Sequence, residues 1–353
     1  MQMDMILSII FVILLRILVF VTTMSGVTPN GEVFLCLPED TVCPTIGHLG
    51  SDIIDPRIVT PTGLCPSGFY PCFGIDPKCG QRLIADISTE DGVSDPGGYP
   101  WQAYLRNVTH IFSGSGALLD SFHVLTAAHK IASIEDQPED LTVYFGVWNP
   151  SNLKDTQSSI VADIRIHPSF NSKTLLNDIA ILRLRQPIVF GIHNTINTIC
   201  LPEYETDFIG SLCSVAGWGQ SSFNSLDAPT SPQKQVTVKV ADAKTCRDSF
   251  AKPNLLGTNV DVYLDQVGEI CAGGEAMRDA CTQDGGSPLV CPGSDGKLNA
   301  AGLVIWGKNC GQPGVYGVYV NLPYYSNWIQ TTIESLNVLD NVVTSNYKRL
   351  TLI

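Results

Sequence analysis

The stretch HVLTAAH, residues 123–129, is a short apolar run that ends in a histidine. Runs of this length and composition, set between turn residues, are typical of buried β-strands. Similar runs recur between clusters of Gly, Pro, Asn and Ser, namely LTVYFGVW (141–148), DIAILRL (178–184), QVTVKV (235–240) and AAGLVIWG (300–307). From Tyr99 onward the sequence therefore predicts an all-β fold.

A helical pattern occurs near the end of the chain, in PYYSNWIQTTI (323–333), where Tyr325, Trp328, Ile329 and Ile333 recur at intervals of three to four residues. This spacing predicts a C-terminal helix with one apolar face. We expect residues 334–353 to form a loosely held tail.

Composition and charge exclude several classes of function. The chain has 353 residues, of which 44% are hydrophobic and 16% charged, as in a globular protein. Its formal net charge of -13 leaves no basic surface for nucleic acid or an anionic membrane. The cysteines show no paired spacing with histidines, so neither a zinc site nor any other cofactor is expected.

The N-terminal 25 residues resemble a secretory signal peptide. An apolar run extends from Ile6 to Val21, and small residues precede Gly26, where cleavage is expected. The alternative is a retained membrane anchor, but Arg16 in the middle of the run makes it a poor span of ~20 residues. We expect a secreted, extracellular protein with no stable membrane span.

Twelve cysteines favour an oxidising compartment. Five lie in a Pro/Gly-rich stretch: Cys36, Cys43, Cys65, Cys72 and Cys79. Seven are spread over the rest: Cys200, Cys213, Cys246, Cys271, Cys281, Cys291 and Cys310. If all twelve are bridged, at least one disulfide must join the two parts, because each part holds an odd number.

Nine short motifs occur in the order found in chymotrypsin-like serine proteases, and the region from about residue 80 to 333 resembles that family. The motifs are YPWQAYL, VLTAAH, NDIAILRL, CLP, VAGWG, ICAGG, DACTQDGGSPLVC, WGKNCGQPGVYGVYV and NWI. The resemblance implies two antiparallel six-stranded β-barrels, with the active site in the cleft between them.

The resemblance also assigns the catalytic positions. His129 matches the family's histidine and Asp178 its aspartate, but Gly285 stands where the family has its nucleophilic serine. In that family serine attacks, histidine takes its proton and aspartate orients the imidazole. Glycine offers no oxygen for an acyl-enzyme, and losing the serine typically costs ~10⁶ in turnover. The His129–Asp178 pair is then expected to persist as a hydrogen-bonded element that packs the cleft.

Two further departures point to lost catalysis. Gln283 replaces the glycine whose N–H helps to form the oxyanion hole, and Ile305 replaces a serine that hydrogen-bonds the catalytic aspartate. Gly285→Ser alone should therefore not restore activity. The competing hypothesis is an active endopeptidase that uses Ser287 as a displaced nucleophile, which would need a remodelled loop to reach His129.

The specificity pocket of the family is partly retained in sequence. Asp279 matches the aspartate at the base of a trypsin-like pocket, and Gly307 and Gly314 match the small residues of its walls. Such a carboxylate would attract an Arg or Lys side chain. The alternatives are that Asp279 is a solvated loop charge or that Gln283 blocks the entrance.

The family's disulfides imply pairs that join Cys213 to Cys291, Cys246 to Cys271, Cys281 to Cys310 and Cys79 to Cys200. The disulfide that normally flanks the histidine is lost from both ends, because Gly114 and Lys130 occupy its two sites.

The remaining cysteines lie in a segment that resembles the clip domain of arthropod serine proteases and their inactive homologues. That resemblance implies pairs that join Cys36 to Cys65 and Cys43 to Cys72. The predicted layout is a signal peptide (1–25), a clip-like domain (26–75), a linker tethered by Cys79 (76–98), a trypsin-like domain (99–333) and the tail (334–353).

The sequence also contains candidate sites for proteolytic activation and for glycosylation. The expected activation site near Ile87 has no preceding Lys or Arg, while Arg82 and Arg57 are alternative cleavage positions. Asn107 begins an Asn-Val-Thr sequon and is the predicted glycosylation site.

By resemblance we expect a noncatalytic clip-domain serine protease homologue that binds secreted proteins in an extracellular protease cascade. Homologues of this kind assist prophenoloxidase activation in arthropod innate immunity, so a protease or prophenoloxidase is the expected partner. The non-enzyme alternative is a secreted recognition or reproductive-fluid binding protein.

Overall fold

The structure is a computed structural model that describes residues 25–28, 32–38, 64–85, 87–219, 232–280, 284–308 and 310–350, with side chains to residue 337. Several predicted features lie outside these ranges. They are the signal peptide up to residue 24, the cleavage position at Arg57, the two cysteines Cys43 and Cys281, and Gln283.

The first half of the protease-like region forms a closed antiparallel barrel with the strand order β10-β7-β6-β5-β8-β9. Its strands are β5 (Gln102–Asn107), β6 (Phe112–Leu118), β7 (His123–Thr126), β8 (Leu141–Phe145), β9 (Gln157–Ile166) and β10 (Ala180–Leu184). The barrel interior is filled by buried side chains that alternate along the strands, as on β8, where Leu141, Val143 and Phe145 are fully buried.

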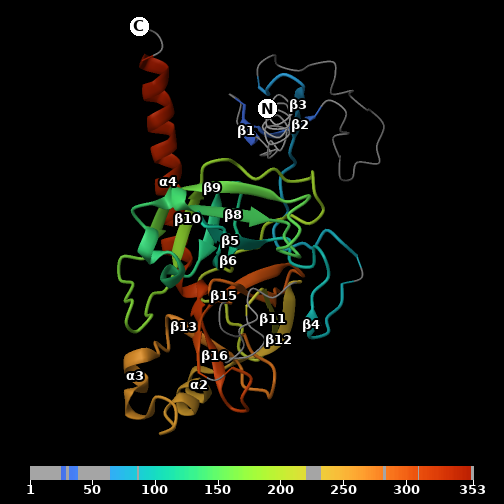
Figure 1. The fold of residues 1–353 in the computed structure, drawn as a ribbon. Coiled ribbons are helices and arrows are strands. Elements are labelled where there is room, and N and C mark those ends of the chain that lie inside the picture. Colours follow the sequence, from blue (N-terminus) through green and yellow to red (C-terminus); the bar gives the residue numbers. More distant parts are fainter. Residues whose placement is uncertain are drawn as a thin grey trace, which may run out of the picture.

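The second half forms another barrel below the first (Figure 1). Its strands run in the order β11-β14-β15-β16-β13-β12, and pairing between β11 and β12 closes the ring. They are β11 (Leu212–Gly217), β12 (Lys234–Ala241), β13 (Glu269–Gly273), β14 (Pro288–Pro292), β15 (Leu298–Gly307) and β16 (Tyr316–Asn321). The predicted all-β fold with two six-stranded barrels is confirmed.

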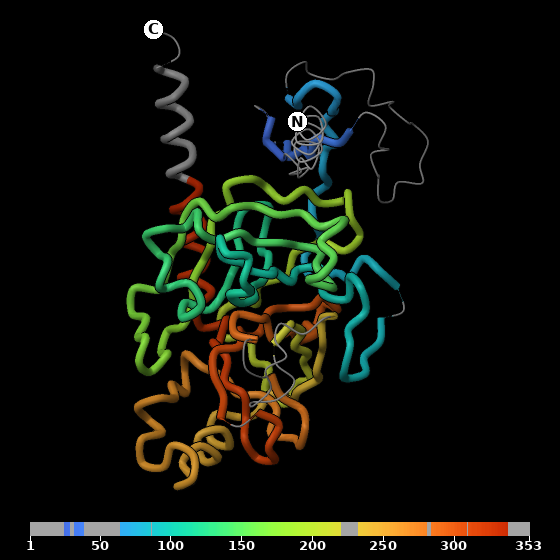
Figure 2. Tube along the Cα trace, in the orientation of Figure 1, coloured from blue at the N-terminus to red at the C-terminus, as the bar shows by residue number. Residues whose placement is uncertain are grey.

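Strand β4 (Gly92–Val93) adds to the edge of the second barrel by pairing with β12. It belongs to the segment predicted as a linker, which passes beside the barrels in Figure 2. The connections also carry short helices: η2 (Ala128–Lys130), η3 (Ala132–Ile134), η4 (Pro138–Asp140), α2 (Ala243–Phe250), η5 (Gly257–Asn259) and α3 (Val260–Tyr263).

The C-terminal helix α4 (Leu322–Leu350) is longer than predicted and continues into the segment expected to form a tail. The helix lies against β10 and β15, one strand from each barrel. Tyr325 and Ile329 are buried, as the pattern predicted, and Leu336 is only 2% exposed. Leu336 continues the same apolar face about one turn beyond Ile333, which extends the helix past the predicted end.

A small sheet of β1 (Ser25–Val27), β2 (Val33–Pro38) and β3 (Phe69–Phe73) lies beside the first barrel (Figure 1). Leu35 and Leu37 of β2 pack with Val189 and Ile192 of the barrel in one apolar cluster. The amide of Ile75 donates to the carbonyl of Phe190 at 3.1 Å. The sheet is thus docked on the barrel rather than suspended from it.

Val189→Asp should release this sheet, because the substitution places a charge at a fully buried position among apolar side chains. We expect added trypsin to cut after Lys78 or Arg82 at least about tenfold faster, as local opening exposes the connection. Val93→Asp is the matched control, since Val93 is 53% exposed. Equal cleavage rates in the two variants would show that the cluster does not hold the sheet.

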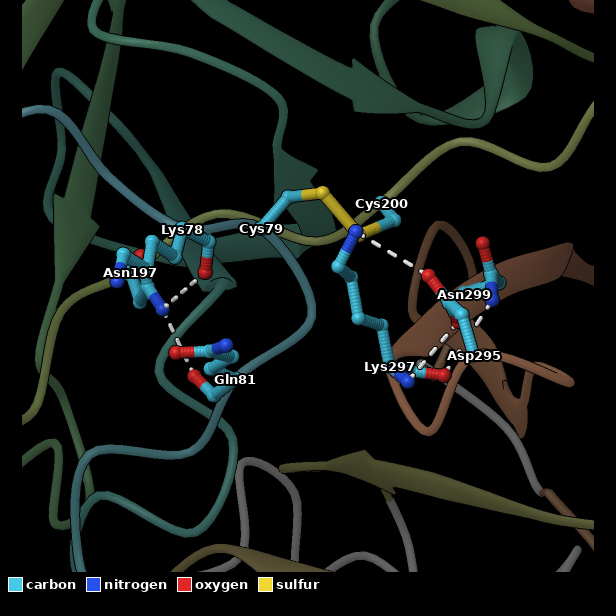
Figure 3. Close-up of a disulfide and its surroundings, with 8 residues drawn as sticks. All are labelled: Lys78, Cys79, Gln81, Asn197, Cys200, Asp295, Lys297 and Asn299. Atoms are coloured by element: carbon cyan, nitrogen blue, oxygen red, sulfur yellow. Dashed lines mark hydrogen bonds and ion pairs between the residues drawn. A yellow bond between two sulfur atoms is a disulfide. The ribbon is translucent and has the colours of Figure 1, made fainter.

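The connection from this sheet enters the protease-like region at a disulfide between Cys79 and Cys200 (Figure 3). Beside it, the side-chain amide of Asn197 donates to the carbonyl oxygens of Lys78 at 2.9 Å and Gln81 at 2.8 Å. These contacts fix the segment that leads from the N-terminal sheet into the barrels.

Candidate functional site

The predicted catalytic histidine and aspartate meet in the first barrel. His129 lies in η2, directly after β7, and Asp178 directly precedes β10, which pairs with β7. The His129 Nδ1 atom lies 2.5 Å from Asp178 Oδ2, and the His129 backbone N–H donates to Asp178 Oδ1 at 2.7 Å. Asp178 is fully buried, whereas the His129 side chain is 24% exposed. The pair keeps the geometry in which a carboxylate orients an imidazole.

Gly285 lies beside this pair, where the resemblance places the nucleophile. A Cβ atom built on Gly285 would lie 2.9 Å from His129 Nε2 and even closer to Lys130 Cε. Both contacts are shorter than the ordinary separation of about 3.5–4.0 Å between non-bonded carbons. Gly285 is not among the described residues with a positive φ, so its backbone would accept another residue. The obstacles to a side chain here are the Lys130 side chain and the imidazole of His129.

Lys130 also crosses Gly114, the other site of the lost disulfide. A Cβ atom at Gly114 would meet Lys130 Cγ at 3.0 Å and Cδ at 3.1 Å. The Lys130 side chain therefore runs over two glycines, Gly114 on β6 and Gly285 before β14, and fills the space of both the missing disulfide and the missing serine side chain.

The charge of Lys130 lies in a partly desolvated place. Burial lowers the pKa of the Lys130 amine, while the carboxylates of Asp284 and Asp178 oppose that shift. The Lys130 ammonium thus interacts electrostatically with one carboxylate in the first barrel region, Asp178, and one in the second, Asp284. In the sequence Lys130 is recognisable only as the residue in place of a cysteine, and its position next to His129 is the one signal for this role.

Ser287, the alternative nucleophile, is fully buried. The side-chain amide of Gln102 donates to Ser287 Oγ at 3.1 Å and to the carbonyl oxygen of Ala216 at 3.0 Å. The Ser287 hydroxyl therefore belongs to an interior network that joins the two barrels. A substrate carbonyl cannot reach it without opening that network.

Ile305 lies on β15 and is 5% exposed, in the apolar cluster that contains Ile179, the neighbour of Asp178. Ile305 has no hydroxyl to donate to the carboxylate. Gln283, the predicted replacement of the oxyanion-hole glycine, lies outside the described residues.

Asp279, Gly307 and Gly314 are the residues of the predicted specificity pocket. Asp279 lines a cavity of about 180 Å³ together with Asp284 and Lys234, and neither Gly307 nor Gly314 is among the described residues that line it. A Cβ atom at Gly314 would instead lie 3.7 Å from Lys252 Nζ. Gly307 lies opposite Gly317 on the paired strand β16.

Asp279 itself is largely buried. Its Oδ2 atom accepts the amide of Gly311 at 3.2 Å, and Oδ1 has no hydrogen-bond partner in the described part of the chain. Burial raises the pKa of Asp279 to about 7. This carboxyl is thus not a solvated loop charge, and a basic ligand would have to displace its proton at neutral pH.

The raised pKa of Asp279 predicts a pH-dependent stability. An unfolded aspartate has a pKa near 4, so between about pH 4 and pH 7 the folded chain holds a proton that the unfolded chain has lost. The contribution of Asp279 to the free energy of unfolding should therefore fall as pH rises through this window and level off above it. In Asp279→Asn this fall should be smaller by about 2–4 kcal/mol.

Urea unfolding at pH 4.5–7.5 measures this difference, with Asp136→Asn, a substitution of an exposed aspartate, as the control. Parallel pH curves for wild type and Asp279→Asn would contradict the prediction. Burial also raises the pKa of Glu269 to about 8, with the same sign, so only the difference between the curves isolates Asp279.

Four disulfides join Cys36 to Cys65, Cys79 to Cys200, Cys213 to Cys291 and Cys246 to Cys271. These are pairs that the resemblance implies. Cys72 and Cys310 are also disulfide-bonded, and their expected partners lie outside the described residues.

The predicted glycosylation site and the predicted cleavage position at Arg82 both make local contacts. Asn107 Oδ1 accepts the amides of Thr109 and Ile111 in the turn after β5. The Arg82 guanidinium lies 5.2 Å above the ring of Tyr99. Within the described ranges, no three His, Cys, Asp or Glu side chains gather as a metal site, and no helix is both long and apolar enough to cross a membrane.

Comparison with known proteins gives one family and several relatives. The trypsin family matches residues 91–329. The chain is 40% identical to the inactive CLIP domain-containing serine protease A3 of Aedes aegypti, over 79% of this chain and 59% of that protein's length. It is 35% identical to the inactive CLIP domain-containing serine protease A8 of Anopheles gambiae, over 72% of this chain and 70% of the relative. It is 32% identical to phenoloxidase-activating factor 2 of Galleria mellonella, over 75% of this chain and 89% of the relative.

Proposed function

The chain belongs to the trypsin family as a clip-domain serine protease homologue, and from this premise we propose that it is a secreted, noncatalytic cofactor that binds other proteins of an extracellular protease cascade. Two of the similar proteins are named inactive and a third is named a phenoloxidase-activating factor. We therefore place this chain at an activation step of the same kind, with a protease or prophenoloxidase as its partner.

The noncatalytic assignment rests on Gly285 and its surroundings, because glycine has no side chain to act as a nucleophile. His129 and Asp178 keep their hydrogen bonds, but the space beside His129 Nε2 is filled by Lys130 and not by a hydroxyl. Without that hydroxyl His129 has no proton to take and no acyl-enzyme forms. Ser287 does not substitute, because it is fully buried and accepts a hydrogen bond from Gln102.

The domain layout and the remaining site roles are part of the proposal. The clip-like unit, supported by the Cys36–Cys65 disulfide and by its sheet, extends over residues 26–75, and the trypsin-like domain over 99–333. Asp279 accepts a basic side chain of a partner when its proton is displaced, and Asn107 carries a glycan. The cysteines Cys43 and Cys281 complete the disulfides of Cys72 and Cys310.

A reconstituted activation assay tests this function. Purified prophenoloxidase and its activating protease are mixed with the full-length chain, and phenoloxidase activity is followed over time. We expect the chain to raise the activation several-fold, while the chain alone hydrolyses no arginyl substrate and takes up no fluorophosphonate label. Labelling that disappears in Ser287→Ala would overturn the noncatalytic assignment, and an unchanged activation would overturn the cascade role.

A further inference from the structure

A second cavity lies in the lower barrel, built from elements that do not include the His129 site. It has a volume of about 340 Å³ and is bounded by the loop at 204–209, the ends of β12 and β13, and the start of α4. None of His129, Lys130, Asp178 or Gly285 lines it. Its volume falls in the lower part of the range of about 300–1,000 Å³ typical of ligand pockets.

Four large apolar side chains that line this groove are also exposed to solvent. The exposed fraction is 60% for Tyr204, 58% for Ile209, 58% for Val267 and 43% for Tyr324. Scattered exposed hydrophobic residues are ordinary, whereas a group that lines one hollow is typical of an interaction site. Two of the four are tyrosines, whose rings are enriched at the energetic centres of protein interfaces.

The exposed charged residues of the groove are both acidic. Glu205 and Asp207 line it together with the buried Glu269, whose raised pKa keeps it protonated at neutral pH, and no Lys, Arg or His does so among the described lining residues. Glu205 and Asp207 are exposed on the loop, next to the apolar rim. The groove therefore offers apolar contact together with a negative potential, which complements a cation with apolar neighbours.

The walls of the groove are held in place by covalent and hydrogen bonds. A disulfide joins Cys246 of α2 to Cys271 of β13, and both cysteines line the cavity. The side-chain amide of Asn321 donates to the carbonyl of Val267 at 2.8 Å, which fixes the exposed Val267 loop against the start of α4. A preformed site loses little conformational entropy when a ligand binds.

We propose that this groove binds a partner-protein segment in which an Arg or Lys lies between large apolar residues. The apolar flanks of the segment contact Tyr204, Val267 and Tyr324, and the cation lies toward Glu205 and Asp207. The inference rests on the proposed cofactor function and assigns it a docking surface outside the degenerate active-site cleft.

Hydrogen exchange of the full-length chain tests the groove directly. The probe is a pool of capped heptapeptides with a central Arg and with Leu, Ile, Phe or Tyr on both sides, at millimolar concentration. A matched pool has citrulline in place of Arg and so has the same shape without the charge. We expect the Arg pool to slow exchange in residues 203–210 and 264–269, and the citrulline pool to bind about threefold or more weakly, with the difference shrinking at high salt.

Two substitutions separate the groove from general surface effects. Val267→Ser and Tyr324→Ser should each weaken binding of the Arg pool about tenfold. Val262→Ser is the control, because Val262 is 53% exposed but does not line the cavity. Thermal unfolding of each variant shows whether the fold is kept.

Four outcomes would overturn the proposal. Three come from hydrogen exchange: no protection by the Arg pool, equal protection by both pools, and protection confined to other segments. The fourth comes from sedimentation: a self-association of the wild-type chain that is lost in Tyr324→Ser would identify a second copy of the chain as the occupant. Any of them would leave the activation assay of the proposed function intact, because that assay does not depend on these peptides.

Discussion

Gly285→Ser is expected to destabilise the protein and to leave it without fluorophosphonate labelling. The new side chain would begin at a position 2.9 Å from His129 Nε2 and in collision with Lys130 Cε. Overpacking of this kind typically costs about 1–3 kcal/mol of the free energy of unfolding. If Lys130 swings away instead, its ammonium leaves the neighbourhood of Asp284 and Asp178.

Two companion variants identify the cause. Gly285→Ala adds the Cβ without an oxygen and should lose nearly as much stability in urea, which shows that the cost is steric. Gly285→Ser combined with Gly114→Cys and Lys130→Cys removes the lysine and should recover most of the loss. It should still label poorly, because Ile305 and Gln283 remain. A Gly285→Ser protein as stable as wild type, or one that cleaves arginyl substrates rapidly, would contradict this account.

Asp178→Ala is expected to cost about 3 kcal/mol or more of the free energy of unfolding, although the protein has no reaction for Asp178 to support. Asp178 is fully buried. Its Oδ1 atom accepts a hydrogen bond from the backbone N–H of His129, and its Oδ2 atom lies within hydrogen-bond distance of His129 Nδ1. Removing Asp178 leaves the backbone N–H of His129 without its acceptor and the imidazole without its carboxylate partner, and a buried polar group left unpaired costs about 1–3 kcal/mol. The degenerate pair is thus expected to hold η2 and β10 together.

Denaturant unfolding of Asp178→Ala measures the loss, with Asp163→Ala as the matched control. Asp163 also pairs with a basic residue, Arg165, but its side chain is 34% exposed. Exposed ion pairs contribute only about 0–1 kcal/mol, so this control should change little. Equal and small losses in both variants would show that the His129–Asp178 pair has no structural role.

Much of the fold could be predicted from local sequence. The short apolar runs between turn residues correspond to β7, β8, β10, β12 and β15, because β-strands need few residues and leave a clear pattern of burial. The residues of the degenerate triad could be named because they sit in short motifs with fixed neighbours. The predicted end of α4 falls short of the observed one, because Leu336 continues the apolar face as a single hydrophobic residue among polar neighbours.

That Gly285 provides no nucleophile follows from the sequence alone, because the absence of a side chain is a local chemical fact. What fills the space of that side chain depends on residues far apart in the chain, so it can be seen only in the folded structure. Lys130 lies across Gly114 and Gly285 because β6, η2 and the turn before β14 converge there. For the same reason the groove around Tyr324 and Val267 has no signature in the sequence. Cavities form between strands that fold from separate segments, and no local pattern records that geometry.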